Sequence, residues 1–178
     1  SRQANDIFNA FEDLDVPKVA AINGFALGGG LEVALGCDYR VASPTAKIGL
    51  PEVKRSLIAA AGGLYRLPRA LPRNVAMELA LTGGDLDAAT AHRHGLANRL
   101  GEPGQALEAA LDLAAEINQN APLAVRASRR AILATQLLDD DEAERFVRRE
   151  SRLVWRSDDF QEGPRAFVEK RLPVWQGR

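Results

Sequence analysis

The spacing of apolar side chains predicts alternating helices and strands over residues 1–100. Ile7, Phe8, Phe11 and Leu14 recur at helical intervals, and we expect a helix over residues 1–15. Short apolar or alternating runs bounded by glycine, proline and serine are typical of strands. On these grounds strands are predicted at residues 18–23, which read as a buried strand, and at 38–42, 46–49 and 97–100. Further helices are predicted at residues 29–36, on both sides of Pro72, and at 88–94.

Two local signals refine this first region. Asp87 is a residue type that caps helix N-termini, and Gly95 suits the position just past a C-terminus. Leu50-Pro51-Glu52 opens a stretch without a clear period, which is predicted to be a loop as far as Gly62-Gly63.

Residues 101–178 show helical patterns alone. Asn120-Ala121-Pro122 is expected to start a helix that runs to about Leu138, and Gly163-Pro164 to start the last helix. Asp139-Asp140-Asp141 places negative charge at the start of a helix between these two, as the helix dipole favours. The first helix of the region presents one predicted apolar face, formed by Leu107, Ala110, Leu111, Ala114 and Ile117.

Composition and charge narrow the class of protein. The chain has 178 residues, of which 46% are hydrophobic and 26% charged, as in ordinary globular proteins. A net charge of −1 argues against a general nucleic-acid binder, and no apolar run approaches the roughly 20 residues of a membrane span. Cys37 is the single cysteine, so no internal disulfide can form, and we expect a reducing, cytoplasmic location. His92 and His94 do not share a helix face, and no metal site is expected.

The sharpest local feature is a predicted strand followed by G-F-A-L-G-G-G and a helix. The first N–H groups of a helix have no internal partner and can hold a phosphate or a developing oxyanion. A dinucleotide fingerprint that starts at Gly28 fails because Val33 stands where its third glycine belongs, and no G-K-[S/T] completes a P-loop. An oxyanion site and tight strand-to-helix packing both remain as interpretations of the glycines.

Two glutamates stand next to this turn. Glu32 lies in the first turn of the predicted helix, and Glu52 follows Pro51 at the end of a predicted strand. Taken singly, the first is typical of a dipole partner and the second of a solvated loop residue. Taken together, they flank one candidate oxyanion site, where a pair of carboxylates can hold a water molecule and exchange protons with it.

These residues belong to a longer pattern that resembles the crotonases, the enoyl-CoA hydratase/isomerase superfamily. The matching segments cover residues 20–43, 48–54, 61–69, 76–83, 91–100, 120–128 and 162–171, in order and with family spacing. The resemblance implies an α/β fold: a crotonase-type spiral of ββα units over residues 1–100, incomplete at the N-terminus, and a helical C-terminal oligomerisation region over 101–178. It further implies that the first third of a usual family chain, with a second oxyanion N–H, is absent from these residues.

The resemblance assigns roles to individual residues. Gly29 would donate its backbone N–H to the thioester oxygen, and Glu32 and Glu52 match the two catalytic glutamates of the hydratases. Ala60 falls where the hydratases have a glycine whose N–H helps to hold the water. Leu64 and Tyr65 depart from the usual family residues, which leaves the acyl group of the substrate open.

The resemblance also implies the ligand and the assembly. Phe167 and Lys170 match a phenylalanine and a lysine that contact the nucleotide end of coenzyme A. The implied activity is that of an enoyl-CoA hydratase acting on an acyl-CoA, with coenzyme A as part of the substrate and no separate cofactor. A homotrimer or a dimer of trimers is implied as well. The alternatives are another coenzyme A thioester dehydratase or isomerase of the superfamily, or a non-catalytic fragment that serves as an oligomerisation module.

Overall fold

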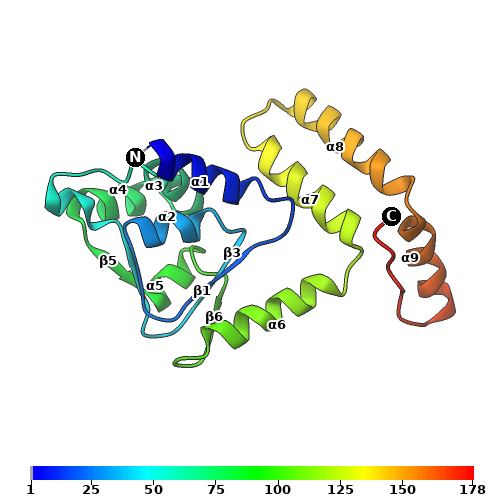
Figure 1. Cartoon of the computed structure of the whole chain (residues 1–178), viewed down its shortest axis with the longest axis horizontal. Coiled ribbons are helices and arrows are strands. Elements are labelled where there is room, and N and C mark those ends of the chain that lie inside the picture. The colour runs from blue at the N-terminus through cyan, green and yellow to red at the C-terminus, as the bar shows by residue number, and fades with distance from the viewer. Residues whose placement is uncertain (1) are drawn as a thin grey trace. The chain divides into compact units, whose positions relative to one another are not determined.

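The computed structural model describes residues 2–178 and divides them into two compact units (Figure 1). The first unit comprises the chain up to Leu14 together with Lys18–Leu113, and the second comprises Asp15–Pro17 and Ala114–Arg178. None of the helices within residues 2–178 has the length and apolarity that crossing a membrane requires.

The first unit contains two three-stranded sheets, with strand orders β1-β3-β6 and β2-β4-β5. The first four strands alternate between the two sheets, since β1 pairs with β3 and β2 pairs with β4, both in parallel. Pairing is also parallel between β3 and β6, and antiparallel between β4 and β5. The strands are β1 (Val19–Ile22), β2 (Phe25–Leu27), β3 (Tyr39–Ala42), β4 (Lys47–Gly49), β5 (Asp85–Asp87) and β6 (Arg99–Leu100).

Helices connect and cover these strands. Leu31 of α2 and Leu67 of α3 are fully buried with Ile48, Leu50 and Leu96 in the core of this unit. The helices are α1 (Arg2–Glu12), α2 (Gly29–Leu35), α3 (Gly63–Ala70), α4 (Arg73–Thr82) and α5 (Ala88–Arg93), with a 3-10 turn η1 at Pro51–Arg55. The predicted helices on both sides of Pro72 are therefore confirmed, whereas the predicted loop after Leu50 begins with a 3-10 turn.

Local capping follows the sequence, while strand burial does not. The Asp87 carboxylate accepts the Thr90 N–H at 2.7 Å, and Gly95 has a φ of +80°, so the predicted ends of α5 are confirmed.

The strand predicted at 18–23 is only partly buried: Ile22 is buried but Ala21 is exposed, because within the described chain β1 pairs with β3 alone. The apolar pattern missed two further strands, β2 and β5, each of which is three residues long.

The second unit is helical. The start of α8 agrees with the prediction, since the Asp139 carboxylate accepts the Glu142 N–H at 2.8 Å. Buried Glu150 of α8 accepts hydrogen bonds of 2.9 and 2.7 Å from Arg130 of α7, and the two helices pack side by side. The helices are α7 (Pro122–Thr135), α8 (Asp140–Trp155) and α9 (Asp158–Glu169), and α6 (Ala106–Asn118) passes from the first unit into this one.

Two helix predictions are wrong in detail. Gly163-Pro164 lies inside α9 rather than at its start, because the Ser157 side chain accepts the Phe160 N–H at 3.2 Å and begins the helix earlier. In α6 the buried residues are Ala106, Ala110 and Leu113, whereas Leu107 and Leu111 of the predicted apolar face are exposed. The Ala106 N–H donates to the Asn23 side chain at 3.1 Å, and this tertiary bond ties down the start of α6.

Candidate active site

The glycine turn between β2 and α2 is tied to the neighbouring strand. Gly28 has a φ of +57°, a backbone conformation that favours glycine, and its N–H donates to the Gly49 carbonyl at 2.9 Å. A Cβ on Gly28 would lie 3.1 Å from Oε1 of Glu52. Gly28 is therefore a packing glycine that lets the Glu52 carboxylate approach the turn.

Gly29 and Gly30 are glycines of a different kind. They open α2, both are exposed, and a Cβ on either one would meet no atom within 4 Å. Close packing therefore does not account for them, since open space lies where their side chains would stand. This leaves the oxyanion interpretation for Gly29, because the first N–H groups of a helix have no partner within the helix.

Glu32 is buried, with 5% of its surface exposed. Its Oε1 accepts two backbone hydrogen bonds, from the Ala61 N–H at 2.8 Å and from the Gly63 N–H at 2.9 Å. Gly63 begins α3, so the carboxylate also meets the positive end of that helix. These donors hold Glu32 in one orientation, and the sequence-based prediction missed both; the A-G-G run at 61–63 was the available signal. The predicted water-binding residue, Ala60, lies exposed beside Ala61.

Glu52 contrasts with Glu32. It lies in the 3-10 turn η1, and its Oε2 is buried without a hydrogen-bond partner among the residues that the structure describes. A buried acceptor without a partner costs about 1–3 kcal/mol, so such an atom calls for a functional explanation. Glu52 contacts the turn at Gly28. Glu32 lies one helical turn after Gly28, and its N–H donates a hydrogen bond to the Gly28 carbonyl at 3.0 Å. The glycine turn thus contacts the Glu52 carboxylate and also holds the backbone of Glu32, whose carboxylate is bound by the N–H groups of Ala61 and Gly63.

Arg66 of α3 supports the segment that holds Glu32. Its Nη1 donates to the Ala61 carbonyl at 3.1 Å, and its Nε and Nη2 bind the carboxylate of Glu12 in α1. Burial by itself lowers the pKa of this guanidinium, but the hydrogen bonds and negative charge of Glu12 outweigh it and raise the pKa. Gly62, with a φ of +114°, leaves the room for Arg66, since a Cβ there would lie 1.7 Å from Nη1. Sequence patterns did not single out this residue.

Phe167 and Lys170 belong to the second unit, whereas the two glutamates belong to the first. Phe167 is near the end of α9 and is 85% exposed, and Lys170 is the exposed residue that ends the helix. The Lys170 N–H donates to the Phe167 carbonyl at 3.3 Å, so these two predicted residues lie close together.

The sequence and the structure of this chain are similar to those of known proteins. The sequence profile described as enoyl-CoA hydratase/isomerase matches residues 1–178. The chain belongs to the enoyl-CoA hydratase/isomerase family. Carnitinyl-CoA dehydratase of Salmonella typhi is 40% identical over 170 residues, which are 93% of this chain and 65% of that protein. The 178 residues thus span less than two thirds of the length of the curated relatives they match.

Solved structures of the family show the same fold. A crystal structure of enoyl-CoA hydratase from Mycobacterium tuberculosis H37Rv matches with a TM-score of 0.91 at 46% identity, over 92% of this chain and 65% of that one. Enoyl-CoA hydratase from Bacillus anthracis matches with a TM-score of 0.95 at 36% identity, over 98% of this chain and 68% of that one. The predicted crotonase-type α/β fold and its helical C-terminal region are confirmed.

Proposed function

We propose that the protein catalyses the reversible addition of water to the α,β double bond of an enoyl-CoA thioester. The observation that carries this proposal is a pair of glutamates next to one glycine turn: the Glu32 carboxylate is held by two N–H groups, and Glu52 has a buried oxygen with no partner among the described residues. Two carboxylates in such different surroundings suit a reaction in which one accepts a proton and the other delivers one. Family membership supports the same chemistry.

In the proposed mechanism the Gly29 N–H donates to the thioester oxygen, where negative charge develops in the transition state. Water lies between the two carboxylates, with the N–H of Ala60 as a further contact. As the oxygen of the water molecule bonds to Cβ, Glu32 takes a proton from that water. Glu52 delivers a proton to Cα. The two bonds from Ala61 and Gly63 both go to Oε1 of Glu32, which leaves Oε2 to face the water. Glu52 starts protonated, and once the proton on Glu32 has passed back to Glu52 the sum of the steps is one water molecule added to the double bond.

The nucleotide end of coenzyme A is assigned to Phe167 and Lys170. An exposed aromatic ring can stack on a base, and a lysine ammonium meets phosphate as a point charge. Coenzyme A is part of the substrate in this proposal, so no separate cofactor takes part. The assembly that we propose is a homotrimer or a dimer of trimers.

Amide substitutions of the two glutamates test the mechanism. Glu32→Gln and Glu52→Gln keep the side-chain shape but cannot exchange a proton, and each is expected to lower kcat for crotonyl-CoA hydration by about 10²–10⁴-fold. Glu78→Gln, on the exposed face of α4, is the matched control and should keep full activity. Thermal unfolding is measured on all variants alongside the absorbance of the conjugated thioester. Near-normal turnover in either active-site variant would remove that glutamate from the mechanism.

The reverse reaction on a hydroxyacyl-CoA is the second candidate. Its support is the 40% identity to proteins named carnitinyl-CoA dehydratase. The same two carboxylates would then remove a proton from Cα and protonate the leaving hydroxyl group. Comparing kcat/KM for crotonyl-CoA and carnitinyl-CoA separates the two candidates. Turnover of neither compound would favour a related thioester isomerase or a non-catalytic role.

A further inference from the structure

Lys170 differs from the other cations of its segment. Residues 158–178 contain four basic side chains, three of which form ion pairs with carboxylates in the same segment. The pairs are Arg165 with Glu169 at 3.0 Å, Arg171 with both Glu162 and Glu169 at 2.6 Å, and Arg178 with Asp158 at 3.2 Å. Lys170 has no carboxylate within ion-pair distance among residues 2–178, so its ammonium is available to an anion from outside the chain.

The backbone of Lys170 is held in an unfavourable conformation. Its φ is +54°, in the left-handed region that usually takes glycine at the end of a helix. Two backbone hydrogen bonds end the helix there. The Lys170 N–H donates to the Phe167 carbonyl at 3.3 Å, and the Arg171 N–H donates to the Ala166 carbonyl at 3.1 Å. A lysine in this conformation needs contacts around it that keep the chain in place.

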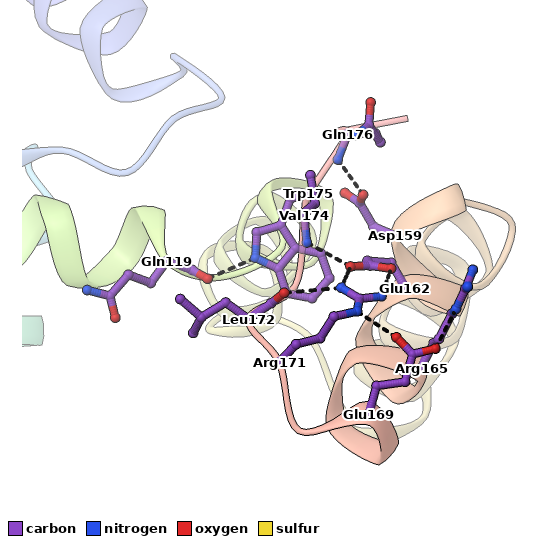
Figure 2. Close-up of polar contacts among 10 residues, drawn as sticks. All are labelled: Gln119, Asp159, Glu162, Arg165, Glu169, Arg171, Leu172, Val174, Trp175 and Gln176. Carbon is purple, nitrogen blue, oxygen red and sulfur yellow. Dashed lines mark hydrogen bonds and ion pairs between the residues drawn. The ribbon is translucent and has the colours of Figure 1, made fainter.

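Arg171, the next residue, supplies such contacts (Figure 2). Its Nη1 and Nη2 donate to the two carboxylate oxygens of Glu162 at 2.6 and 2.9 Å, and its Nε donates to Glu169 at 2.6 Å. Nη1 also reaches the Leu172 carbonyl at 3.1 Å. A planar guanidinium can satisfy this two-sided geometry, which a lysine ammonium cannot reproduce. The hydrogen bonds from Arg171 and from the Val174 N–H lower the pKa of Glu162 to about 2, so the pair is fully charged near neutral pH.

The tail beyond Arg171 is anchored to the same unit. Glu162 accepts the Val174 N–H at 2.8 Å, and Asp159 accepts the N–H groups of Gln176 and Gly177 at 2.6 and 2.9 Å. The indole of Trp175 donates to the Gln119 carbonyl at 2.8 Å (Figure 2). Lys170 therefore lies between α9 and a tail that acidic side chains of α9 hold in position.

We propose that Arg171, clamped by Glu162, is a positioning residue that holds Lys170 in its left-handed conformation beside Phe167, ready to bind phosphate groups of coenzyme A. This inference rests on the nucleotide-end role proposed above for Phe167 and Lys170. Arg171 itself is neutralised by its two carboxylates and acts through Lys170. Holding the site in its bound conformation before the ligand arrives reduces the entropy lost on binding.

Calorimetric titration of the 178-residue chain with coenzyme A tests the clamp. Arg171→Gln is expected to raise the Kd about tenfold, the cost of immobilising one or two side chains on binding. Arg165→Gln is the matched control, because it removes the same charge from the same segment, residues 158–178, but leaves the tail bonds intact; its Kd should stay within about twofold. Equal losses in both variants would mean that net charge alone is responsible and would overturn the proposal.

Glu162→Ala gives the sharper test because the two explanations predict opposite signs. Removing a negative charge near an anion site should tighten coenzyme A binding if only the electrostatic field matters. The clamp predicts that the Kd rises, again about tenfold, because Arg171 and Val174 lose their acceptor. A lower or unchanged Kd in Glu162→Ala would overturn the clamp.

Two further measurements separate the clamp from the role of Lys170. Lys170→Gln should weaken coenzyme A binding but not binding of pantetheine, the part without phosphates. If Lys170→Gln has no effect, or the wild-type chain does not bind coenzyme A, the nucleotide-end role fails and the clamp fails with it. If Lys170→Gln weakens binding and Arg171→Gln does not, the clamp alone fails. Hydrogen exchange of the Val174, Gln176 and Gly177 amides should speed up in Arg171→Gln; unchanged exchange with weaker binding would make Arg171 a direct ligand contact and overturn the positioning role.

Discussion

The glutamates of the first unit and the basic residues of the second are held by different kinds of contact. Glu32 is buried, and its partners are backbone N–H groups about thirty residues further along the chain. Arg171 is exposed, and its partners are carboxylates two and nine residues away. Backbone donors in a buried site stay fixed with the fold and are little affected by salt, whereas exposed ion pairs are screened and can open locally.

This difference predicts what substitutions do in each region. In the first unit they should change the rate of the chemical step or the stability of the whole unit. In the second they should change the affinity for coenzyme A and the order of the tail, with the fold kept. The variants below test this division, starting with the one from which we expect the largest effect.

Gly29→Pro removes the N–H that we assign to the thioester oxygen. Proline is tolerated at the first position of a helix, so the fold should remain while kcat falls about 10²–10³-fold. Gly29→Ala is the control, because it keeps the N–H and its Cβ would meet no atom within 4 Å. Steady-state hydration kinetics and thermal unfolding of both variants are compared. A proline variant with full activity would rule out this N–H as the oxyanion donor.

Arg66→Met tests whether the support behind Glu32 matters to the whole unit. Arg66 is 5% exposed and its partner Glu12 is 33% exposed, so removing the guanidinium takes away the hydrogen bonds that it donates to a partly buried carboxylate and to the Ala61 carbonyl. We expect a loss of about 2–3 kcal/mol in the free energy of unfolding, below the 3–5 of a fully buried pair. Arg69→Met, an exposed neighbour that also stacks on Tyr65, should cost no more than about 0.5 kcal/mol. Equal denaturation midpoints for the two variants would contradict the supporting role of Arg66.

Acid should release the tail of the second unit. The pKa of Glu162 is lowered from 4.5 to about 2 when it binds Arg171 and the Val174 N–H. A lowered carboxyl pKa adds stability above about pH 4.5, and that stability is lost as the pH falls towards 2. Trp175 fluorescence, in a Trp155→Phe background, should report this release between those pH values.

Glu162→Ala should remove most of this pH dependence. Arg165 and Arg171 are the cations that act on Glu162, and the dependence that remains comes from Glu169, whose pKa the hydrogen bond from Arg171 also lowers. A tail signal that stays constant from pH 5 to 2 in the parent protein would show that Glu162 does not control docking.

The amino-acid sequence by itself determined the features that act over a few residues. The cap predicted at Asp87 forms, and the helix predicted to begin at Asp139-Asp140-Asp141 does begin there, with Asp139 as its cap. In both, a side chain reaches an N–H three residues away whatever the rest of the fold does. Glu32, Glu52 and the glycine turn were also singled out as candidates from the sequence, and the resemblance to the crotonases gave them their roles. The local pattern failed where two signals competed, as at α9, where the Ser157 cap prevailed over Gly163-Pro164.

The tertiary structure alone decided how the charged groups of the first unit are held. No spacing rule connects Glu32 to the N–H groups of Ala61 and Gly63, or Arg66 to Glu12, 54 residues away. The contacts of Glu32 arise because α2 and α3 pack together, which places distant backbone N–H groups within hydrogen-bond distance of its carboxylate. The tertiary structure also gives two glycines of the turn different surroundings. Gly28 lies against the Glu52 carboxylate, whereas a Cβ on Gly29 would meet no atom within 4 Å. Burial and long-range contacts, which a linear sequence pattern does not encode, place the glutamates Glu32 and Glu52 in surroundings that differ from each other.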